Sequence, residues 1–384
     1  MSIFVKKICS LIMRKDVFGI IYAGEENLNL RELVNLRSVG ALPVGGRYRV
    51  VDFMLSNLVN SGIRNVGVIP RKNYHSLMDH LGSGKEWDLN RKNDGLMIIP
   101  PYDTIENVGS YHGITDTLKG ASWFIRHATQ PYCLLSGSSN IHNKTYNKMF
   151  DFHLETDADI TMLYSRVDSK TKSCNADDVR LELDVTGRIV DMSMQNKKYD
   201  KMGMGVYLLR KDLLQYLVDD AALRGKYNLT TDVFLHKLKS LKIFGFEHEG
   251  YVGRINSTAS YYKINMDFLT IEAQKDLFYT GNNVYTKIKD EVPTRYGDAA
   301  IAKNCLLGSG CVINGTVENS VLFRGVHIAK GVNIKNCIIM QGSEIYENSR
   351  LTNVILDKKV SVRPNSILTG SSEYPVIIPK GANV

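Results

Sequence analysis

The residues that could bind a phosphate group lie at the end of an apolar run near the start of the chain. VFGIIYAG (17–24) ends in Gly24 and continues as EENLNL (25–30). Such an apolar run is typical of a buried parallel strand. The turn that follows such a strand binds phosphate when glycines let backbone N–H groups close around the oxygens. Here two carboxylates, Glu25 and Glu26, stand where a polyphosphate would dock.

These two carboxylates would oppose a nucleotide. A carboxylate ~4 Å from a phosphate oxygen repels it by about 4 kcal/mol at an effective dielectric constant of about 20. We therefore predict that the turn binds a polyphosphate poorly. The alternative is that both glutamates point into solvent and that the backbone still binds phosphate. Because the turn has lost its glycines, we regard this alternative as the weaker interpretation.

A longer motif follows the turn. GGRYRVVDF (45–53), LSN (55–57) and NSG (60–62) resemble the bacterial glucose-1-phosphate adenylyltransferase (ADP-glucose pyrophosphorylase) family. The departures from the family motifs resemble its GlgD-type regulatory subunit, the paralogue that accompanies the catalytic subunit. The resemblance runs from about residue 17 to the C-terminus and returns in GITD (113–116), GMGVY (203–207), residues 261–269 and YTKIKDEVPTRYG (285–297).

The resemblance implies a reaction whose requirements can be compared with this chain position by position. The family transfers the adenylyl group of ATP to glucose 1-phosphate by positioning the reactants, with Mg²⁺ bridging the phosphates. Active members read GGxGxRL in the phosphate turn, whereas residues 24–30 lack two of the glycines and the arginine. Their phosphate-binding lysine aligns with Val39, although a nearby arginine is kept as Arg37. The glutamine that reads the base aligns with Arg71, which offers donors only.

The metal and sugar-phosphate positions differ as well. By the resemblance, the first metal-binding aspartate aligns with Ser138 or Ser139 and the second with Arg254. A cation at the second position is incompatible with Mg²⁺. The lysine that binds the sugar phosphate aligns with Gln195, and the glutamate before it with Met194. The resemblance therefore implies no catalytic residue and no bound metal or other cofactor in this chain. Each loss of ~1.4 kcal/mol in transition-state stabilisation already lowers the rate tenfold.

What remains is the scaffold of the cleft. We expect its glycines and its aspartate to serve turn geometry and helix capping, and Arg71 to contact a phosphate or a glutamate. Three basic residues near the predicted domain junction, Lys287, Lys289 and Arg295, either bind an anion such as a phosphorylated metabolite or belong to a solvated linker. The residual nucleotide and sugar-phosphate cleft is predicted to include Gly24, Arg37, Arg71, Gly113, Asp116, Gly137 and Gly205.

Strand-like and helical patterns alternate along residues 15–281, which must position these side chains. The alternation predicts an α/β nucleotidyltransferase domain with a Rossmann-like, mostly parallel (GT-A-like) sheet. Ligands bind beyond the carboxyl ends of the strands in such a sheet, where Gly24 and Gly137 lie. Amphipathic patterns predict helices at 52–61 and 115–127. Apolar runs predict strands at 17–24, 65–70, 131–137, 159–167 and 203–209.

After a predicted linker (282–300), the apolar period changes. Large aliphatic residues recur every six positions in three triplets that start seventeen residues apart, at Leu322, Ile339 and Leu356. This period predicts a left-handed parallel β-helix of hexapeptide repeats over 301–384, rather than a β-sandwich. An earlier coil is two residues short. Stacked coils have open ends and a flat face, so we expect oligomerisation through this domain.

Composition bounds the remaining possibilities. A chain of 384 residues favours two domains, and its net charge of +8 is scattered rather than gathered into a stripe that would bind nucleic acid. No segment has the length and apolarity of a membrane span. Residues 1–14 are interpreted as an N-terminal extension, either disordered or foreign to the native protein. Six cysteines without metal-ligand spacing indicate reduced thiols in a cytoplasmic protein.

These observations favour a non-catalytic or weakly active regulatory subunit of glucose-1-phosphate adenylyltransferase in bacterial glycogen biosynthesis. By the resemblance, it would assemble with the catalytic subunit as an α₂β₂ heterotetramer and activate it, and that partner would need Mg²⁺. One alternative is an active or retargeted sugar-phosphate nucleotidyltransferase. A minor alternative is a hexapeptide-repeat acyltransferase, for which His327 is the sole histidine in the repeats.

Overall fold

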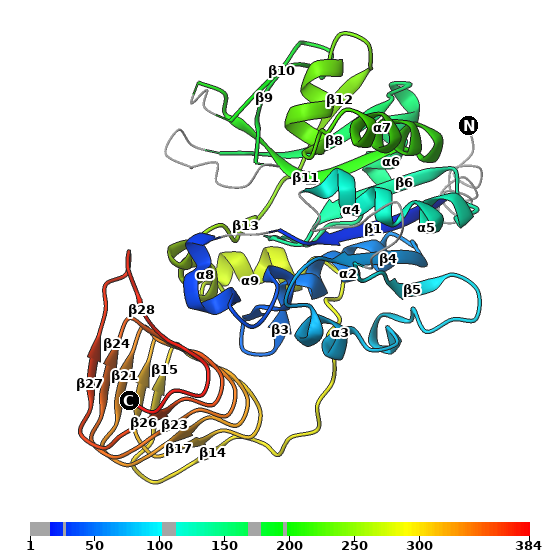
Figure 1. Cartoon of the computed structure of the whole chain (residues 1–384). Helices are drawn as coiled ribbons and strands as arrows, with labels where there is room; N and C mark the ends of the chain where they lie inside the picture. The colour runs from blue at the N-terminus through cyan, green and yellow to red at the C-terminus, as the bar shows by residue number, and fades with distance from the viewer. Residues whose placement is uncertain (1–15, 26–27, 102–112, 168–177, 195–197) are drawn as a thin grey trace.

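The apolar run near the start of the chain forms β1 (Val17–Ala23), an interior strand of a nine-stranded sheet. The computed structural model describes residues 16–25, 28–101, 113–167, 178–194 and 198–384. The predicted extension, residues 1–14, lies outside these ranges. The sheet belongs to the first of two domains, and the second is a stack of short-stranded coils at the C-terminal end of the chain (Figure 1).

The sheet is mixed, with a parallel centre. β1 is parallel to β4 and β6, and β4 is parallel to β5. On the other side of β6, β11 is antiparallel to β6, β8 and β9, while β12 is parallel to β8. All five predicted strands are confirmed, as β1, β4, β6, β8 and β11. The strands are β4 (Asn65–Pro70), β5 (Gly95–Ile98), β6 (Tyr132–Gly137), β8 (Ile160–Arg166), β9 (Arg180–Leu183), β10 (Ile189–Ser193), β11 (Lys201–Arg210) and β12 (Ile243–Glu247).

Helices cover both faces of this sheet because both sides of β1 are apolar. Phe18, Ile20 and Tyr22 pack under α4, α5 and α7, whereas Val17 and Ile21 pack under α2, α3 and α6. The predicted helix 52–61 is confirmed as α2. The predicted helix 115–127 is wrong in one respect, because the chain leaves the helical conformation at Ala121, directly after Gly120, and forms two helices. The helices are α2 (Val50–Asn60), α3 (His75–Leu81), α4 (Ile114–Gly120), α5 (Ser122–His127), α6 (Asn147–Glu155) and α7 (Lys211–Leu223).

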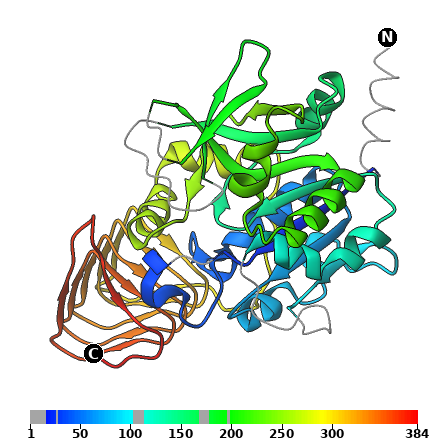
Figure 2. The same ribbon diagram turned by 45° about the horizontal axis from the view of Figure 1, so that its top comes forward.

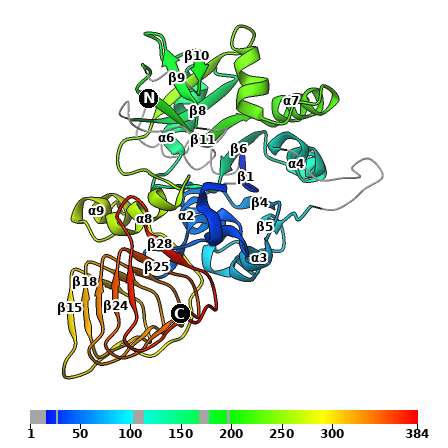
Figure 3. The same cartoon turned by 60° about the vertical axis from the view of Figure 1, so that its left-hand side comes forward.

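Shorter elements connect the sheet to the second domain. Helices α8 and α9 lie between the large sheet and the coils (Figures 1 and 3). The Ser257 side chain caps α8 by accepting the N–H of Ser260. The remaining elements of the first domain are η1 (Leu28–Val34), η2 (Val39–Ala41), β2 (Pro43–Val44), β3 (Tyr48–Arg49), η3 (Lys85–Trp87), β7 (Asn140–Ile141), η4 (Leu229–Phe234), η5 (Leu235–Lys237), β13 (Gly253–Arg254), α8 (Thr258–Asp267) and α9 (Ile271–Phe278).

The second domain is a prism of three parallel five-stranded sheets, which fits a left-handed β-helix. Figure 2 shows its coils stacked from yellow to red. The predicted inward positions are confirmed: eight of the nine residues of the three triplets are buried, and Leu368 in the last coil is partly buried. The three sheets are β14 (Arg295–Tyr296), β17 (Val312–Ile313), β20 (His327–Ile328), β23 (Glu344–Ile345) and β26 (Ser361–Val362); β15 (Ile301–Lys303), β18 (Thr316–Glu318), β21 (Asn333–Lys335), β24 (Arg350–Thr352) and β27 (Ile367–Thr369); and β16 (Leu306–Leu307), β19 (Val321–Leu322), β22 (Ile338–Ile339), β25 (Val354–Leu356) and β28 (Val376–Ile378).

The first coil begins inside the range predicted as a linker. β14 pairs with β17, so Arg295 and Tyr296 already belong to the prism. The short coil predicted from the sequence is confirmed by the register, since Leu307 pairs with Leu322 and Leu322 pairs with Ile339. Hexapeptide spacing missed β14 because a two-residue strand on the outermost coil carries no apolar triplet of its own.

An asparagine ladder stabilises one corner of the prism. Asn304, Asn319, Asn336 and Asn353 all have positive φ, between 45° and 53°, a conformation in which asparagine is among the better tolerated non-glycine residues. Their amides hydrogen-bond along the stack, with 2.7 Å from Asn319 Nδ2 to Asn336 Oδ1 and 3.2 Å from Asn336 Nδ2 to Asn353 Oδ1. The hydroxyl of Tyr262, on α8, donates to the Asn336 carbonyl at 2.7 Å. The ladder therefore also anchors the first domain.

We expect Asn336→Ala to destabilise the β-helix. The substitution removes two ladder hydrogen bonds and places a Cβ-bearing residue without a local side-chain bond at φ 51°, for a combined cost of about 2–4 kcal/mol in the free energy of unfolding. Asn336→Gly also loses the two hydrogen bonds, but glycine adopts φ 51° readily, so this variant should lose less stability. Urea denaturation provides the measurement, with exposed Asn333→Ala on the same coil as the control. Equal stability of Asn336→Ala and the control would contradict the ladder's role.

Candidate functional site

The predicted cleft lies where three neighbouring strands end. β1 is parallel to β4 and β6, with Ala23 opposite Pro70 and Tyr22 opposite Gly137. Gly24, Arg71 and Ser138 therefore follow the carboxyl ends of adjacent strands at one edge of the sheet, which is where α/β sheets bind ligands. A Cβ on Gly24 would lie 2.8 Å from the Cβ of Arg71, so these two predicted residues are in contact.

Glu25 turns into this cleft rather than into solvent. Its Oε1 accepts the backbone N–H of Ser138 at 2.6 Å, and its Oε2 accepts the Ser138 hydroxyl at 2.6 Å. Ser138 itself is buried. The solvent-facing alternative for this glutamate is therefore wrong, because two donors at the end of β6 hold its carboxylate inside. Glu26, the second carboxylate of the turn, lies outside the described residues.

The second position predicted to have lost a metal ligand holds a buried ion pair. Arg254 lies on β13, which pairs with β7, and its Nη1 lies 3.1 Å from Asp178 Oδ1. The same guanidinium donates to the Gly203 carbonyl at 2.9 Å and to the Ser165 hydroxyl at 2.7 Å. Burial lowers the pKa of Arg254, and the neighbouring Asp178 opposes this shift.

Mg²⁺ does not fit this arrangement. Carboxylate and other oxygen ligands bind Mg²⁺ in proteins, but one aligned position carries a guanidinium and the other a serine whose N–H and hydroxyl both donate to Glu25. Within the described residues, no group of three or more histidine, cysteine, aspartate or glutamate side chains is placed to hold a metal ion.

The positions aligned with the phosphate and sugar-phosphate lysines carry no charge. Val39 is buried on η2. Gln195 lies outside the described residues, but Met192, Ser193 and Met194 line a small cavity of about 260 Å³ together with Thr230. The lining of this cavity has methionines and hydroxyls and, among the described residues, no cation that would bind a sugar phosphate.

Three predicted scaffold residues shape the backbone. A Cβ on Gly113 would lie 2.2 Å from the carbonyl oxygen of Tyr227, so only glycine fits there. Asp116 lies in the first turn of α4, where a carboxylate favours the helix dipole. Gly205 adopts φ 62° where the pairing of β11 with β8 shifts register. The two glycines thus lie where turn geometry requires them, whereas the N-cap residue of α4 is Gly113 and not Asp116.

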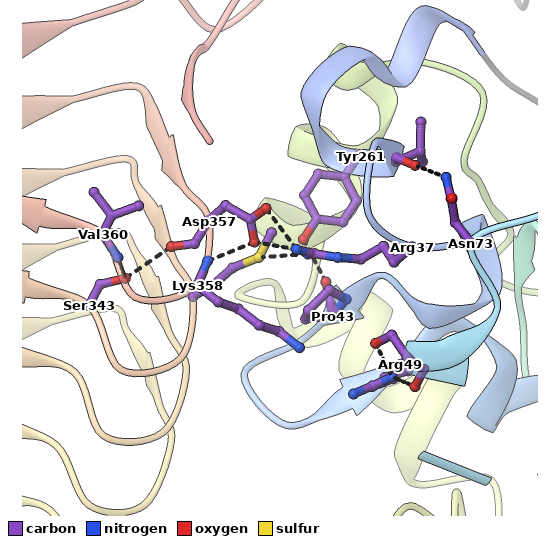
Figure 4. A network of polar contacts seen from close by, with 12 residues as sticks. Arg37, Pro43, Arg49, Asn73, Tyr261, Ser343, Asp357, Lys358 and Val360 are labelled. Carbon is purple, nitrogen blue, oxygen red and sulfur yellow. Dashed lines mark hydrogen bonds and ion pairs between the residues drawn. The ribbon is translucent and has the colours of Figure 1, made fainter. Parts of the chain in front are cut away.

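Arg37 does not line the cleft. Its guanidinium forms a bidentate ion pair with Asp357 of the β-helix, at 2.8 and 2.7 Å, and lies 3.6 Å from the sulfur of Met340 (Figure 4). Both charged side chains are at most 3% exposed. The prediction that Arg37 belongs to the cleft is wrong because the segment between the turn and α2 packs on the β-helix, where this arginine meets a buried carboxylate.

The sequence predicts only part of a basic cavity that lies between the two domains. It has a volume of about 470 Å³, and its cationic lining includes Arg49, Lys287, Lys289, Arg324 and Lys358. Burial, with the charges of Arg49 and Arg37, lowers the pKa of Lys358 to about 7. Lys287 and Lys289 thus lie at a cavity as the anion-site hypothesis requires, whereas Arg295 is not part of its lining. The sequence does not predict Arg324 and Lys358 as part of this site, since they are far along the chain from its residues in the first domain.

Comparisons with known proteins agree with this architecture. The nucleotidyl transferase family matches residues 18–270, and the GlmU-like C-terminal hexapeptide family matches residues 290–372. The glycogen biosynthesis protein GlgD of Bacillus subtilis (strain 168) is 33% identical over 373 residues, which cover 96% of this chain and 97% of that protein. GlgD of Geobacillus stearothermophilus is 36% identical with the same coverage. The glucose-1-phosphate adenylyltransferase of Geobacillus stearothermophilus is 32% identical over 84% of each chain.

The chain is a GlgD-type member of the glucose-1-phosphate adenylyltransferase family. The resemblance seen in the motifs is thereby confirmed, as is the combination of a nucleotidyltransferase domain with a hexapeptide domain. No helix among the described residues is long and apolar enough to cross a membrane. His327, on which the acyltransferase alternative depends, is exposed on β20 between Val312 and Glu344 of the neighbouring strands.

We expect Arg254→Asp to destabilise the first domain without creating a metal site. The change places a second carboxylate beside buried Asp178, and breaking a buried pair costs about 3–5 kcal/mol. Thermal unfolding should show a lower midpoint, and Mg²⁺ at about 10 mM should not restore this midpoint. Arg210→Asp, at an arginine whose side chain is 59% exposed, is the control and should change little. Recovery of the unfolding midpoint on addition of Mg²⁺ would contradict the conclusion that Mg²⁺ does not fit this site.

Proposed function

We propose that this chain is a non-catalytic regulatory subunit of glucose-1-phosphate adenylyltransferase, which forms ADP-glucose and diphosphate from ATP and glucose 1-phosphate. It assembles with the catalytic subunit, as an α₂β₂ heterotetramer, and raises that subunit's activity. The names of its relatives, glycogen biosynthesis protein GlgD and glucose-1-phosphate adenylyltransferase, support a role in glycogen biosynthesis.

One observation carries the proposal. The positions aligned with the metal-binding aspartates are Arg254 and either Ser138 or Ser139, and none of these is a carboxylate. Within the chain, Ser138 binds Glu25 and Arg254 pairs with Asp178. Loss of the metal removes the term that neutralises phosphate charge in the transition state, and every ~1.4 kcal/mol lost is tenfold in rate. In the heterotetramer the chemistry, and the Mg²⁺ it needs, belong to the partner.

The retained architecture supports an assembly role. The β-helix keeps its inward positions through the stack, and its third sheet packs on the first domain. A protein that has lost the groups for chemistry but keeps both domains and their interface is suited to binding and orienting a second subunit. A phosphorylated metabolite that binds in the interdomain cavity would act between the same two domains.

The assay that tests the proposal compares this chain alone, the catalytic subunit alone and their mixture. With ATP, glucose 1-phosphate and Mg²⁺, this chain alone should form ADP-glucose at least about a hundredfold more slowly than the catalytic subunit, given the missing metal ligands. The mixture should exceed the catalytic subunit alone, and light scattering should give the mass of a heterotetramer. Robust turnover by this chain alone, or two separate species in the mixture, would refute the proposal.

The effector part of the proposal predicts a pH-dependent anion site. Lys358 has a pKa of about 7, so its cationic form prevails below pH 7 and is lost as the pH rises. Sulfate, whose charge is constant in this range, should bind several-fold more weakly at pH 8 than at pH 6. Calorimetric titration measures this change, and Lys358→Met should abolish it, whereas exposed Lys359→Met should not. Binding that is unaffected by pH and by Lys358→Met would place the anion elsewhere.

A further inference from the structure

Glu25 occupies a small cradle at the carboxyl end of β6. Both of its carboxylate oxygens accept hydrogen bonds from one residue, Ser138, whose N–H and hydroxyl converge on it at 2.6 Å each. The distance from the Ser138 hydroxyl lies in the range of hydrogen bonds from a hydroxyl to a carboxylate. Ser138 is 1% exposed, so its two donors depend on this carboxylate rather than on bulk water.

Two glycines give the cradle its shape. A Cβ on Gly137 would lie 2.5 Å from Glu25 Oε1, so any larger residue there would push the carboxylate out. A Cβ on Gly40 would lie 3.1 Å from the Ser138 hydroxyl oxygen, so this glycine lets η2 pack closely behind the donor. The space in front of Ser138 is therefore open to an oxyanion and is filled by one from the chain itself.

We propose that this cradle, formed by Gly137, Ser138 and Gly40, is an anion site that Glu25 occupies as an internal ligand. A phosphate oxygen offers Ser138 the same acceptor as the carboxylate oxygen it now bonds. Because Glu25 is tethered only a few residues from the end of β1, its effective concentration at the cradle is high. A free phosphate group competes only for the small fraction of molecules in which the glutamate has left.

The internal ligand has a consequence for the state of the cleft. With Glu25 in place, both buried donors of Ser138 have an acceptor without any nucleotide. This part of the cleft therefore needs no ligand to satisfy its hydrogen bonds. Removal of the carboxylate leaves these donors unpaired and opens the cradle to phosphate. The inference concerns this chain alone and does not depend on whether it activates a partner.

Glu25→Ala tests the proposal with inorganic pyrophosphate as the probe, in the absence of Mg²⁺. Calorimetry should show pyrophosphate binding to the variant at least tenfold more tightly than to the wild-type chain. Hydrogen–deuterium exchange of the peptide containing Ser138 locates the site. This peptide should exchange faster in Glu25→Ala than in wild type, because its N–H has lost its acceptor, and added pyrophosphate should slow the exchange again.

Two further variants make the result specific. In Glu25→Ala/Ser138→Ala most of the gained affinity should disappear, and Glu249→Ala, at a glutamate that is exposed and outside the cradle, should behave as wild type. Pyrophosphate that binds in the interdomain cavity would bind the wild type and all three variants alike. It would not change hydrogen–deuterium exchange at Ser138, so the two sites can be distinguished. If Glu25→Ala does not fold, Glu25→Asp, shorter by one methylene, should give a smaller gain of the same kind. Equal affinity of the folded variant and wild type, or a gain that persists without the Ser138 hydroxyl and leaves its exchange unchanged, would overturn the proposal.

Discussion

The structure depends on the packing of the first domain against one face of the β-helix. Val321, Ile338 and Ile355, from successive coils, share a buried apolar cluster with residues of α2, α8 and the segment before α2. Within this interface Arg37 and Asp357 pair as charges, both almost completely buried. Each of these charges is strongly unfavourable without the other, since breaking a buried pair costs about 3–5 kcal/mol. The interface therefore holds the two domains in one arrangement.

The same segment of chain connects this interface to the cleft. The stretch from the phosphate turn to α2 carries Glu25 at one end and Arg37 near the middle, and it contributes Val39 and Leu42 to the shared cluster. Arg31 also contacts Tyr374 of the last coil, with its guanidinium 5.2 Å from the ring centre. Changes at the nucleotide turn and at the β-helix thus act on one continuous piece of backbone. The basic cavity lies beside it, bounded by Arg49 and by Lys358.

The altered cleft residues are satisfied within the chain. Arg254 pairs with Asp178, and Glu25 binds Ser138, so neither leaves a buried charge without a partner. Leaving a buried polar group unpaired costs about 1–3 kcal/mol, and a buried charge costs more. The side chains at the positions that the resemblance aligns with the family's metal ligands and phosphate turn are therefore compatible with a stable cleft. These internal pairs explain how the fold accommodates Glu25 and Arg254 at the cleft.

Elements whose signal is local could be predicted from the amino-acid sequence. Apolar runs located β1, β4, β6, β8 and β11, and the six-residue period placed the inward positions of the β-helix, because burial imposes these periods on neighbouring residues. The motifs also predict changed positions, such as Val39 and Arg254. The contacts of these residues could not be predicted, because they form between distant parts of the chain. The partners of Glu25, Arg37 and Arg254 lie 113, 320 and 76 residues away, and the cations of the cavity come from both domains. A contact between such distant residues leaves no periodic trace in a single sequence, so it emerges only when the two domains fold and pack together.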